Sequence, residues 1–344
     1  METKVNGKII KKSASDYPNK FSFNCIDLVK FICAILVCVL HIKIFTVGES
    51  ETGDFVNLII CHGICRIAVP FYFVTAGFLL FRKTDINRIG DYKDRIQDYC
   101  FKILRLLGIW YLLLFAGSKV QLWYLGGLVI AVIFLSLLFY FKVPMKLIIV
   151  ISLLLYVIGL LGDAYAVFGQ SFRELKVFEY ISNFYGDLWG TTRNGIFMGF
   201  IFVLIGALFA HRKIVMNMTV AVIGFLTSTG LLLFEVWALK YYWDNKEYNM
   251  YISLLPTVFF LFYIATHINL KDRKIYAKLR VVGMLIFYLH LFVKFAVNYV
   301  AEFFALDFVK NNLFIILTVT CVISFIIEWL SHKEKLSWIK WLYS

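Results

Sequence analysis

Charged residues are scarce in this sequence. Only 17% of the 344 residues are charged, whereas 61% are hydrophobic and 18% are aromatic, and the mean hydropathy is +0.79. A soluble protein would carry about 25% charged residues. Only four prolines are present, and no Gly/Ser-rich or low-complexity stretch offers a linker. These shortages exclude a soluble enzyme, a secreted disulfide scaffold and a disordered chain.

Several familiar site signatures are also missing. The seven cysteines are odd in number and lie almost all within apolar runs, so neither a disulfide framework nor a zinc spacing emerges and we expect them to pack as small side chains. The sequence has no Walker loop, dinucleotide fingerprint or Gly-x-Ser-x-Gly elbow. No metal site is predicted. The candidate site must therefore be sought among the polar residues inside the apolar runs.

Long apolar runs, in contrast, are abundant. Windows of ~20 apolar residues predict ten membrane spans. The first 21 residues are polar and basic, so the first apolar run is predicted to be a retained helix rather than a signal peptide. We therefore predict an all-α integral membrane protein, a bundle of about ten transmembrane helices, with a basic tail at 1–21, a membrane domain at 22–332 and a short tail at 333–344. The predicted spans are 22–45, 55–81, 98–117, 121–141, 145–162, 193–211, 214–237, 250–268, 280–301 and 311–331.

The net charge of +13 follows the predicted topology. With the N-terminus in the cytoplasm, the inner tails, loops and helix starts hold 24 of the 35 Lys and Arg residues, and the outer side holds eight. The other three, Lys30, Lys43 and Arg66, lie within spans. This asymmetry is the positive-inside rule. It predicts cytoplasmic N- and C-termini, a multi-pass position in a bacterial plasma membrane and contact with lipids, and it argues against nucleic acid as a partner.

The first predicted helix carries two ionisable residues on one face. Lys30 and His41 are eleven residues apart, and eleven steps of ~100° bring them within ~20° of each other, about 16 Å apart along the axis. Ionisable residues inside a membrane need a partner or a task. One interpretation pairs Lys30 with Asp27 as an anchor and gives His41 a hydrogen bond to a neighbouring helix. The other places both along a functional pathway.

The second predicted helix contains Arg66 in mid-span, followed by Pro70 and Gly77. This order predicts a kinked helix with a buried guanidinium. Because arginine stays charged, Arg66 must face a polar cavity or a carboxylate. A buried ion pair without a substrate remains an alternative.

Further polar residues lie near the predicted membrane boundaries. Lys102 and Arg105 begin the third span on the inner side, where ordinary anchoring is the alternative to ligand binding. On the outer side the candidates for contact with a substrate are Trp123, Tyr124, Arg193 and Asn194. The polar, aromatic outer segment 163–192 is compatible with a sugar-like acceptor. His62 and His290 are predicted to be packing or interface residues rather than catalytic ones.

Three motifs resemble the acyltransferase-3 family of integral membrane acyltransferases. They are a basic residue, ten residues and a histidine in the first helix; Arg with Pro-Phe-x-Phe and Gly-Phe in the second; and a basic pair entering the third. Later blocks around Gln121, Thr192 and Tyr288 are most similar to the Gram-positive branch, which includes the membrane domain of vancomycin-resistance serine racemases. Two departures are lysine at positions 30 and 102, where the family often has arginine, and Gln121, where it often has histidine. Lysine lacks the bidentate fork that clamps phosphate.

The resemblance implies a ten-helix bundle that transfers an acyl group, usually acetyl, from cytosolic acyl-CoA to a hydroxyl of a cell-surface or exported glycan. It implies that His41 is the essential histidine, that Lys30 is its basic partner and that Lys102 and Arg105 serve acyl-CoA. The chemistry fits, since transfer from a thioester needs a base and a positive group for the oxyanion. Histidine suits the first task, and Arg66 suits the second.

The sequence therefore predicts an O-acetyltransferase with acetyl-CoA as donor substrate, no permanently bound cofactor, and a glycan or lipid-linked sugar as acceptor. Association between copies of the chain is left open. Two alternatives remain. One is an amino-acid (serine) transporter-like membrane domain, as in the racemase-linked relatives. The other is a non-catalytic partner in polysaccharide export.

Overall fold

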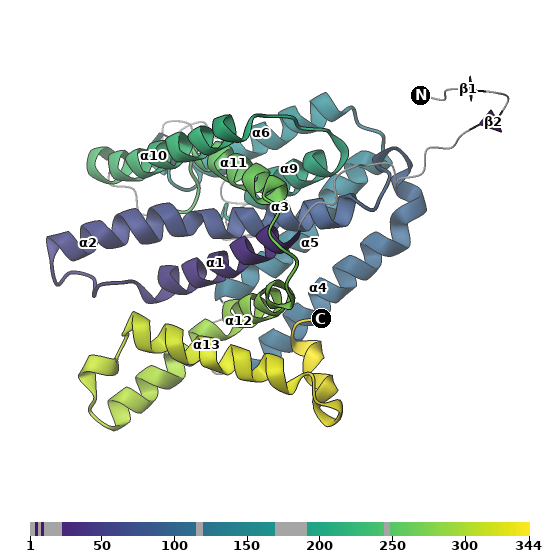
Figure 1. The fold of residues 1–344 in the computed structure, drawn as a ribbon. Helices are drawn as coiled ribbons and strands as arrows, with labels where there is room; N and C mark the ends of the chain where they lie inside the picture. The colour runs from purple at the N-terminus through teal and green to yellow at the C-terminus, as the bar shows by residue number, and fades with distance from the viewer. Residues whose placement is uncertain (1–3, 6–7, 10–22, 115–119, 169–190, 244–247) are drawn as a thin grey trace.

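The computed structural model describes residues 4–5, 8–9, 23–114, 120–168, 191–243 and 248–344 (Figure 1). Apart from a two-residue hairpin, β1 (Lys4–Val5) paired antiparallel with β2 (Lys8–Ile9), the regular structure in this part of the chain is helical. This confirms the all-α prediction. The remainder of the predicted tail 1–21 and most of the outer segment 163–192 lie outside the described residues.

Each predicted span contains helix in the structure. The α-helices are α1 (Phe23–Ile42), α2 (Glu51–Asn57), α3 (Ala68–Phe81), α4 (Lys93–Leu113), α5 (Trp123–Tyr140), α6 (Met145–Leu161), α9 (Phe200–His211), α10 (Met218–Trp243), α11 (Leu254–His267), α12 (Lys274–Phe303) and α13 (Leu313–Leu330). Short 3-10 or π segments are η1 (Leu58–Gly63), η2 (Ile64–Ile67), η3 (Ile86–Tyr92), η4 (Val120–Leu122), η5 (Gly195–Gly199), η6 (Asp307–Val309) and η7 (Glu334–Leu342).

Length and composition divide these helices into two groups. Three apolar helices, Met145–Leu161, Gly195–His211 and Leu254–His267, are shorter, and α4, in the predicted span 98–117, has a charge-rich first half. Six helical runs in the described residues are long and apolar enough to cross a membrane, which indicates a membrane protein. They are Asn24–Ile42, Glu51–Phe81, Trp123–Tyr140, Met218–Tyr242, Lys274–Phe303 and Leu313–Leu330.

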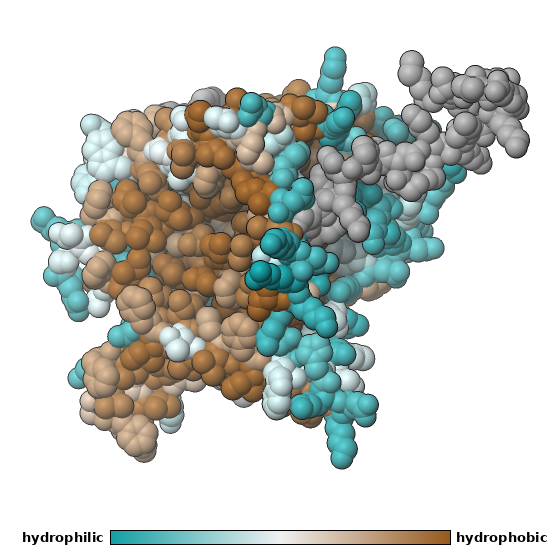
Figure 2. Space-filling view, in the orientation of Figure 1, coloured by the Kyte–Doolittle hydropathy of each residue, from teal (hydrophilic) through white to brown (hydrophobic). Residues whose placement is uncertain are grey.

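The surface has the polarity that these helices predict. Figure 2 shows hydrophobic side chains along α1, α10 and α13, whereas hydrophilic side chains gather near the C-terminus. The run Glu51–Phe81 is the most enclosed, with 72% of its apolar window buried, against 22% for Met218–Tyr242. The helix that contains Arg66 is therefore central, and α10 is peripheral.

The central run is irregular where the sequence predicts a kink. It passes from α2 through the π segment η1 and the 3-10 segment η2 before α3 begins at Ala68. Pro70 lacks an N–H and cannot donate to the carbonyl of Arg66. The irregular turns therefore lie on the N-terminal side of the proline, and they contain Arg66 itself.

Two glycines let α3 and α9 touch backbone to backbone. A Cβ on Gly77 would lie 2.3 Å from the carbonyl oxygen of Val203, and one on Gly206 would lie 2.1 Å from that of Val74. Small residues of this kind permit close helix packing in membranes, where contact between helices supplies much of the stability. This contact fixes α3 in the middle of the bundle.

One end of the bundle carries the start of α1, the start of α12 and the segment η7; we call it the basic end. Arg280 pairs with Asp27 across α12 and α1 at 3.7 Å, and Lys278 pairs with Glu328 of α13 at 3.3 Å. Asp27 thus pairs with Arg280 rather than with Lys30 on its own helix. The sequence predicts that the basic end is cytoplasmic, and this orientation stays a prediction.

Candidate functional site

The histidine predicted to be essential lies against a second histidine. Nδ1 of His41, near the end of α1, is 3.2 Å from Nε2 of His290 on α12. Lys294, one turn further along α12, donates from Nζ to the main-chain carbonyl of His41 at 2.8 Å. The two helices also pack closely at Gly283, whose added Cβ would lie 3.3 Å from Cα of Phe31. This packing brings the two histidine rings together.

The backbone determines which nitrogen of each neutral ring carries the proton. Nδ1 of His41 is 2.9 Å from the carbonyl oxygen of Val37, and Nδ1 of His290 is 3.1 Å from that of Ile286. A carbonyl only accepts, so each neutral ring is assigned its proton on Nδ1. His41 then shares its Nδ1–H between Val37 and Nε2 of His290. Its own Nε2 keeps a lone pair and has no hydrogen bond among the described residues, so His41 can act as a base.

His41 opens onto a small polar pocket of about 30 Å³. We call it the histidine pocket. It has room for a few water molecules or a hydroxyl group. Its lining residues come from six parts of the chain and include three predicted site residues besides His41. They are Val37, Leu40, His41, Cys65, Arg66, Val69, Gln121, Trp123, Arg193, Met198, Asn249 and Phe287.

Arg66 reaches this pocket from the irregular turn before α3. Its terminal nitrogen Nη2 lies 3.3 Å from Nδ1 of His62 one turn earlier, and its buried Nε has no hydrogen-bond partner among the described residues. Of the two environments predicted for Arg66, the structure shows the polar cavity; no ion pair with a carboxylate is found for it in the described residues. A cation with donors left over in a pocket can bind an anion or an oxyanion.

A buried carboxylate, Asp163, holds Asn249, which lines the pocket. Asp163, beyond the end of α6, accepts hydrogen bonds from the main-chain N–H and side-chain amide of Asn249 at 2.7 and 2.8 Å, and from the N–H of Met250 at 3.0 Å. Burial raises the pKa of Asp163, and these hydrogen bonds oppose the shift. Asn249 in turn accepts from Nη1 of Arg193 at 2.9 Å.

The four predicted outer residues take different positions. Arg193 lies over the ring of Trp123 at 5.1 Å, and both line the histidine pocket. Tyr124 lines a different cavity, at the basic end. Asn194 caps η5, because its Oδ1 accepts from the N–H groups of Ile196 and Phe197. The structure thus gives Asn194 a local structural task, and its contact with substrate stays a prediction.

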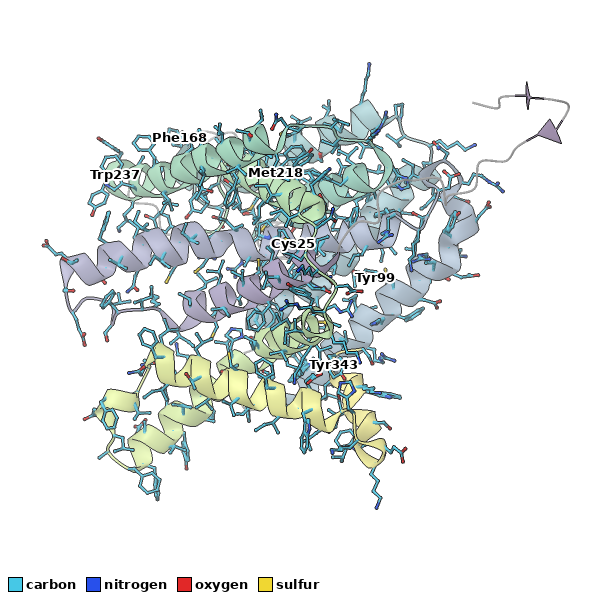
Figure 3. All side chains as sticks on the ribbon, in the orientation of Figure 1. Cys25, Tyr99, Phe168, Met218, Trp237 and Tyr343 are labelled. Atoms are coloured by element: carbon cyan, nitrogen blue, oxygen red, sulfur yellow. The ribbon has the colours of Figure 1, made fainter. Side chains whose placement is uncertain are left out.

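A second and much larger cavity, of about 490 Å³, lies at the basic end. We call it the cationic cavity. Three cations from three helices line it, Lys30 of α1, Lys102 of α4 and Arg280 of α12. Tyr99 and Tyr343, labelled in Figure 3, also belong to its wall. The cavity is therefore positive, and its size is that of a site for a small molecule.

The structure separates the predicted pair Lys102 and Arg105. Lys102 lines the cationic cavity, whereas Arg105 donates to the main-chain carbonyl of Ser344 and lies over the ring of Trp341 at 5.2 Å. Nearby, Nε1 of Trp110 donates to the carbonyl of Leu342 at 2.9 Å. Arg105 thus holds the segment after α13 against α4, and Arg280 is the third cation of the cavity.

The two cavities share one wall residue. Phe287 of α12 lines the cationic cavity on one side and the histidine pocket on the other. Next to it, the buried Gln121 donates from Nε2 to the carbonyl of Tyr288 at 3.2 Å, and its Oε1 has no partner among the described residues. The predicted functional residues other than Arg105 and Asn194 thus form two adjacent groups within one bundle.

Sequence reasoning predicted His290 as a packing or interface residue, which agrees with its buried place between α12 and α1, and it missed Arg280 and the pair Asp163–Asn249 as residues around the two cavities. His290 was present in a recognised block, Tyr288-Leu-His290, but nothing in one sequence shows that it meets His41, 249 residues away. In the sequence, Arg280 is one of many basic residues on the predicted inner side, and nothing sets it apart from them. The signal for Asp163 is an acidic residue directly after an apolar run.

The cysteines take no part in a cross-link or a cluster of ligands. All seven are free thiols, and six of them are buried. In the described part of the chain, no group of three or more His, Cys, Asp or Glu side chains lies close enough together to hold a metal ion.

Comparisons with known proteins point to racemases. The chain is 29% identical to an amino-acid racemase of Enterococcus faecalis over 279 residues, which are 73% of this chain and 37% of that protein. It is 25% identical to a second amino-acid racemase of that species, over 92% of this chain and 47% of the relative. A serine/alanine racemase of Enterococcus gallinarum is 27% identical over 69% of this chain and 36% of its own length. No family model and no solved structure matches.

The chain thus spans between about a third and a half of the length of these curated relatives. Their names agree with the predicted resemblance to vancomycin-resistance racemases. Membership of the acyltransferase-3 family stays a prediction.

Proposed function

We propose that this protein is a membrane O-acyltransferase that moves an acetyl group from cytosolic acetyl-CoA to a hydroxyl of a cell-surface or exported glycan. One observation carries the proposal. The cationic cavity and the histidine pocket lie next to each other in one bundle and share Phe287. A site for an anionic donor and a site for proton transfer therefore adjoin, as an acyl transfer between two substrates requires.

The donor would occupy the cationic cavity. Coenzyme A carries several phosphate charges, and Lys30, Lys102 and Arg280 line a volume of about 490 Å³. Arg280 offers the planar fork that suits phosphate, while the two lysines act as point charges. The thioester would point along α1 toward His41, about 16 Å from Lys30.

The acceptor hydroxyl would enter the histidine pocket, where Nε2 of His41 removes its proton. The hydroxyl oxygen forms a bond to the acyl carbon, the carbon–sulfur bond breaks, and the proton passes to the leaving thiolate to give free coenzyme A. Arg66 would stabilise the oxyanion of the tetrahedral intermediate. While His41 is protonated, its Nδ1–H donates to Nε2 of His290, which spreads the charge over two rings.

The lining of the histidine pocket supports a sugar as the acceptor, and the apolar surface supports a place in a membrane. Trp123 and Arg193 form a stacked pair at the edge of the histidine pocket, which suits the ring face and the hydroxyl groups of a sugar. The apolar surface in Figure 2 suits a cell membrane, with lipids around the helices.

A second function, carriage of an amino acid, rests on the resemblance to the membrane domain of serine racemases, and the curated relatives are named amino-acid and serine/alanine racemases. In that case Arg66 and Arg193 would bind the carboxylate of serine or alanine. The histidine pocket, at about 30 Å³, is small for a whole amino acid and ample for a hydroxyl group. The geometry therefore favours the acyltransferase.

The deciding experiment measures acetyl-CoA binding and turnover by the purified protein in nanodiscs, with wild type beside His41→Ala. We expect both to bind acetyl-CoA and only the wild type to transfer acetyl to a sugar acceptor. Loss of a general base costs about 10²–10⁴-fold in rate.

His332→Ala is a control, because this histidine pairs with Glu328 at the basic end, away from both cavities. If His41→Ala transfers acetyl at the wild-type rate, His41 is not the general base. Failure of every variant to bind acetyl-CoA would overturn the acyltransferase, and uptake of labelled serine into vesicles would then test the second function.

A further inference from the structure

Three aromatic rings gather at the wall of the cationic cavity where it meets the histidine pocket. Phe287 lines both of them, and the rings of Tyr72 and Tyr124 lie 5.9 and 5.8 Å from its own. The two tyrosine rings are 5.9 Å apart. The three residues come from α12, α3 and α5, so they form a triangle across the bundle. We call this triangle the aromatic wall.

The wall is held in place from several sides. The hydroxyl of Tyr72 donates to the main-chain carbonyl of Lys30 at 2.8 Å. Tyr124 packs edge-on against Phe73 at 4.8 Å. Phe287 is only 6% exposed, and its ring contacts those of Tyr288 at 5.5 Å and of His290, the partner of His41, at 6.5 Å. The ring of Phe287 therefore cannot move without disturbing the packing of its neighbours.

The wall sets the space available to an acyl group. A donor bound at Lys30, Lys102 and Arg280 has to bring its acyl carbon past Phe287 to meet His41. Beyond the wall the histidine pocket offers about 30 Å³, which also has to hold the acceptor hydroxyl. An acyl group that reaches this pocket therefore has little free space, and each further methylene would have to displace a packed ring or a pocket side chain.

We propose that the aromatic wall, through Phe287, determines acyl-chain length and restricts the donor to short-chain acyl thioesters. This inference rests on the proposed acyltransferase function. It makes Phe287 a specificity-determining residue, which touches the acyl group but takes no part in proton transfer.

The test compares acetyl-CoA, butanoyl-CoA and hexanoyl-CoA as donors. In the wild type we expect kcat/KM to fall about tenfold or more for each added methylene, the discrimination that a close-fitting apolar site gives. In Phe287→Ala we expect the ratio of butanoyl to acetyl transfer to rise at least about tenfold. Phe287→Leu, which keeps more of the packing, should shift the same ratio less and serves if the alanine variant does not fold.

The matched control is Phe292→Ala, on the same helix but 38% exposed. It should leave the chain-length profile unchanged. Equal profiles in wild type and both Phe287 variants would overturn the role of the wall, and so would a wild type that prefers long acyl chains.

A second measurement does not depend on acyl transfer. Cys65 lines the histidine pocket and is buried. With the other six cysteines replaced by serine or alanine, a small charged thiol reagent applied at the basic end should label Cys65 at least about tenfold faster in Phe287→Ala than with Phe287 intact.

Unchanged labelling would show that Phe287 does not separate the two cavities. Faster labelling in Phe287→Ala together with no binding of acetyl-CoA by any variant would show that Phe287 separates the two cavities. The same result would overturn both the acyltransferase function and the role of Phe287 in chain length. The two measurements therefore distinguish failure of the inference from failure of the proposed function.

Discussion

At the scale of single residues, the pair His41–His290 is the most informative feature of the site. Both rings donate from Nδ1 to a carbonyl four residues earlier on their own helix. The same geometry makes Nε2 of His290 an acceptor for His41. In the proposed transfer, His290 would position His41 and favour its protonated form, one hydrogen bond away from the reacting atoms.

This role predicts different results for two substitutions of His290. A hydrogen bond to a charged group contributes about 1.5–3 kcal/mol, so His290→Leu should lower kcat about 10- to 100-fold. The KM for acetyl-CoA should stay unchanged, because the cationic cavity is intact. His290→Gln supplies a carbonyl oxygen that accepts from His41, and it should recover part of the lost rate. Equal losses in both variants, with equal loss of thermal stability, would indicate a packing role alone.

At the scale of helices, the site depends on how α3 is held. Arg66 lies in the 3-10 segment η2, whose hydrogen-bond geometry is poorer than that of an α-helix. The position of Arg66 is therefore set by α3, the helix that follows η2. Gly77 and Gly206 bring α3 against α9 with backbone contact. The contact leaves no room for a methyl group on either helix.

Gly77→Ala should therefore lower the stability of the folded protein. The new Cβ would lie 2.3 Å from the carbonyl oxygen of Val203, and overpacking of this kind typically costs about 1–3 kcal/mol. The measurement is the midpoint of thermal unfolding in detergent. Gly230→Ala on α10 is the matched control, because nothing lies within 4 Å of its added Cβ; it should be neutral or stabilising. The same midpoint for both variants would show that the α3–α9 contact is looser than described.

At the scale of the whole molecule, the basic residues gather at one end of the bundle, and apolar side chains cover the helices that extend from it. Figure 2 shows apolar side chains along the long helices and hydrophilic side chains near the C-terminus. The cationic cavity lies at this basic end. The positive-inside rule predicts that this end faces the cytoplasm. In the proposed mechanism the acyl-CoA donor would then enter at the basic end, and the acceptor would approach the histidine pocket from the other side.

Single cysteines in a cysteine-free background test this orientation. Lys83, just after α3, and Thr46, between α1 and α2, are exposed and lie beyond opposite ends of the run Glu51–Phe81. An impermeant thiol reagent should label Thr46→Cys in intact cells and Lys83→Cys only after the cells are permeabilised. The reverse labelling pattern would show that the protein has the opposite orientation in the membrane. The cationic cavity would then face away from the cytosol, and a cytosolic donor could not enter it.

The sequence alone determined the helical membrane class and the approximate place of each apolar helix, because long apolar runs separated by charged or turn residues are local features. The starts of α2 at Glu51 and α4 at Lys93 lie outside the predicted spans, and the count of ten spans stays a prediction. The sequence also singled out His41, Arg66, Lys30 and Lys102, since a polar side chain in an apolar run is conspicuous without any knowledge of its neighbours. The motif resemblance came from the same local spacing.

The tertiary structure decided which of these residues meet. The contact of His41 with His290 and the convergence of Lys30, Lys102 and Arg280 depend on how helices far apart in the chain pack. Such packing is fixed by the shape of whole surfaces, as at Gly77 and Gly206, and no local pattern encodes it. For the same reason, only the structure could separate Tyr124 from Trp123 and Arg105 from Lys102, and place Phe287 between the two cavities.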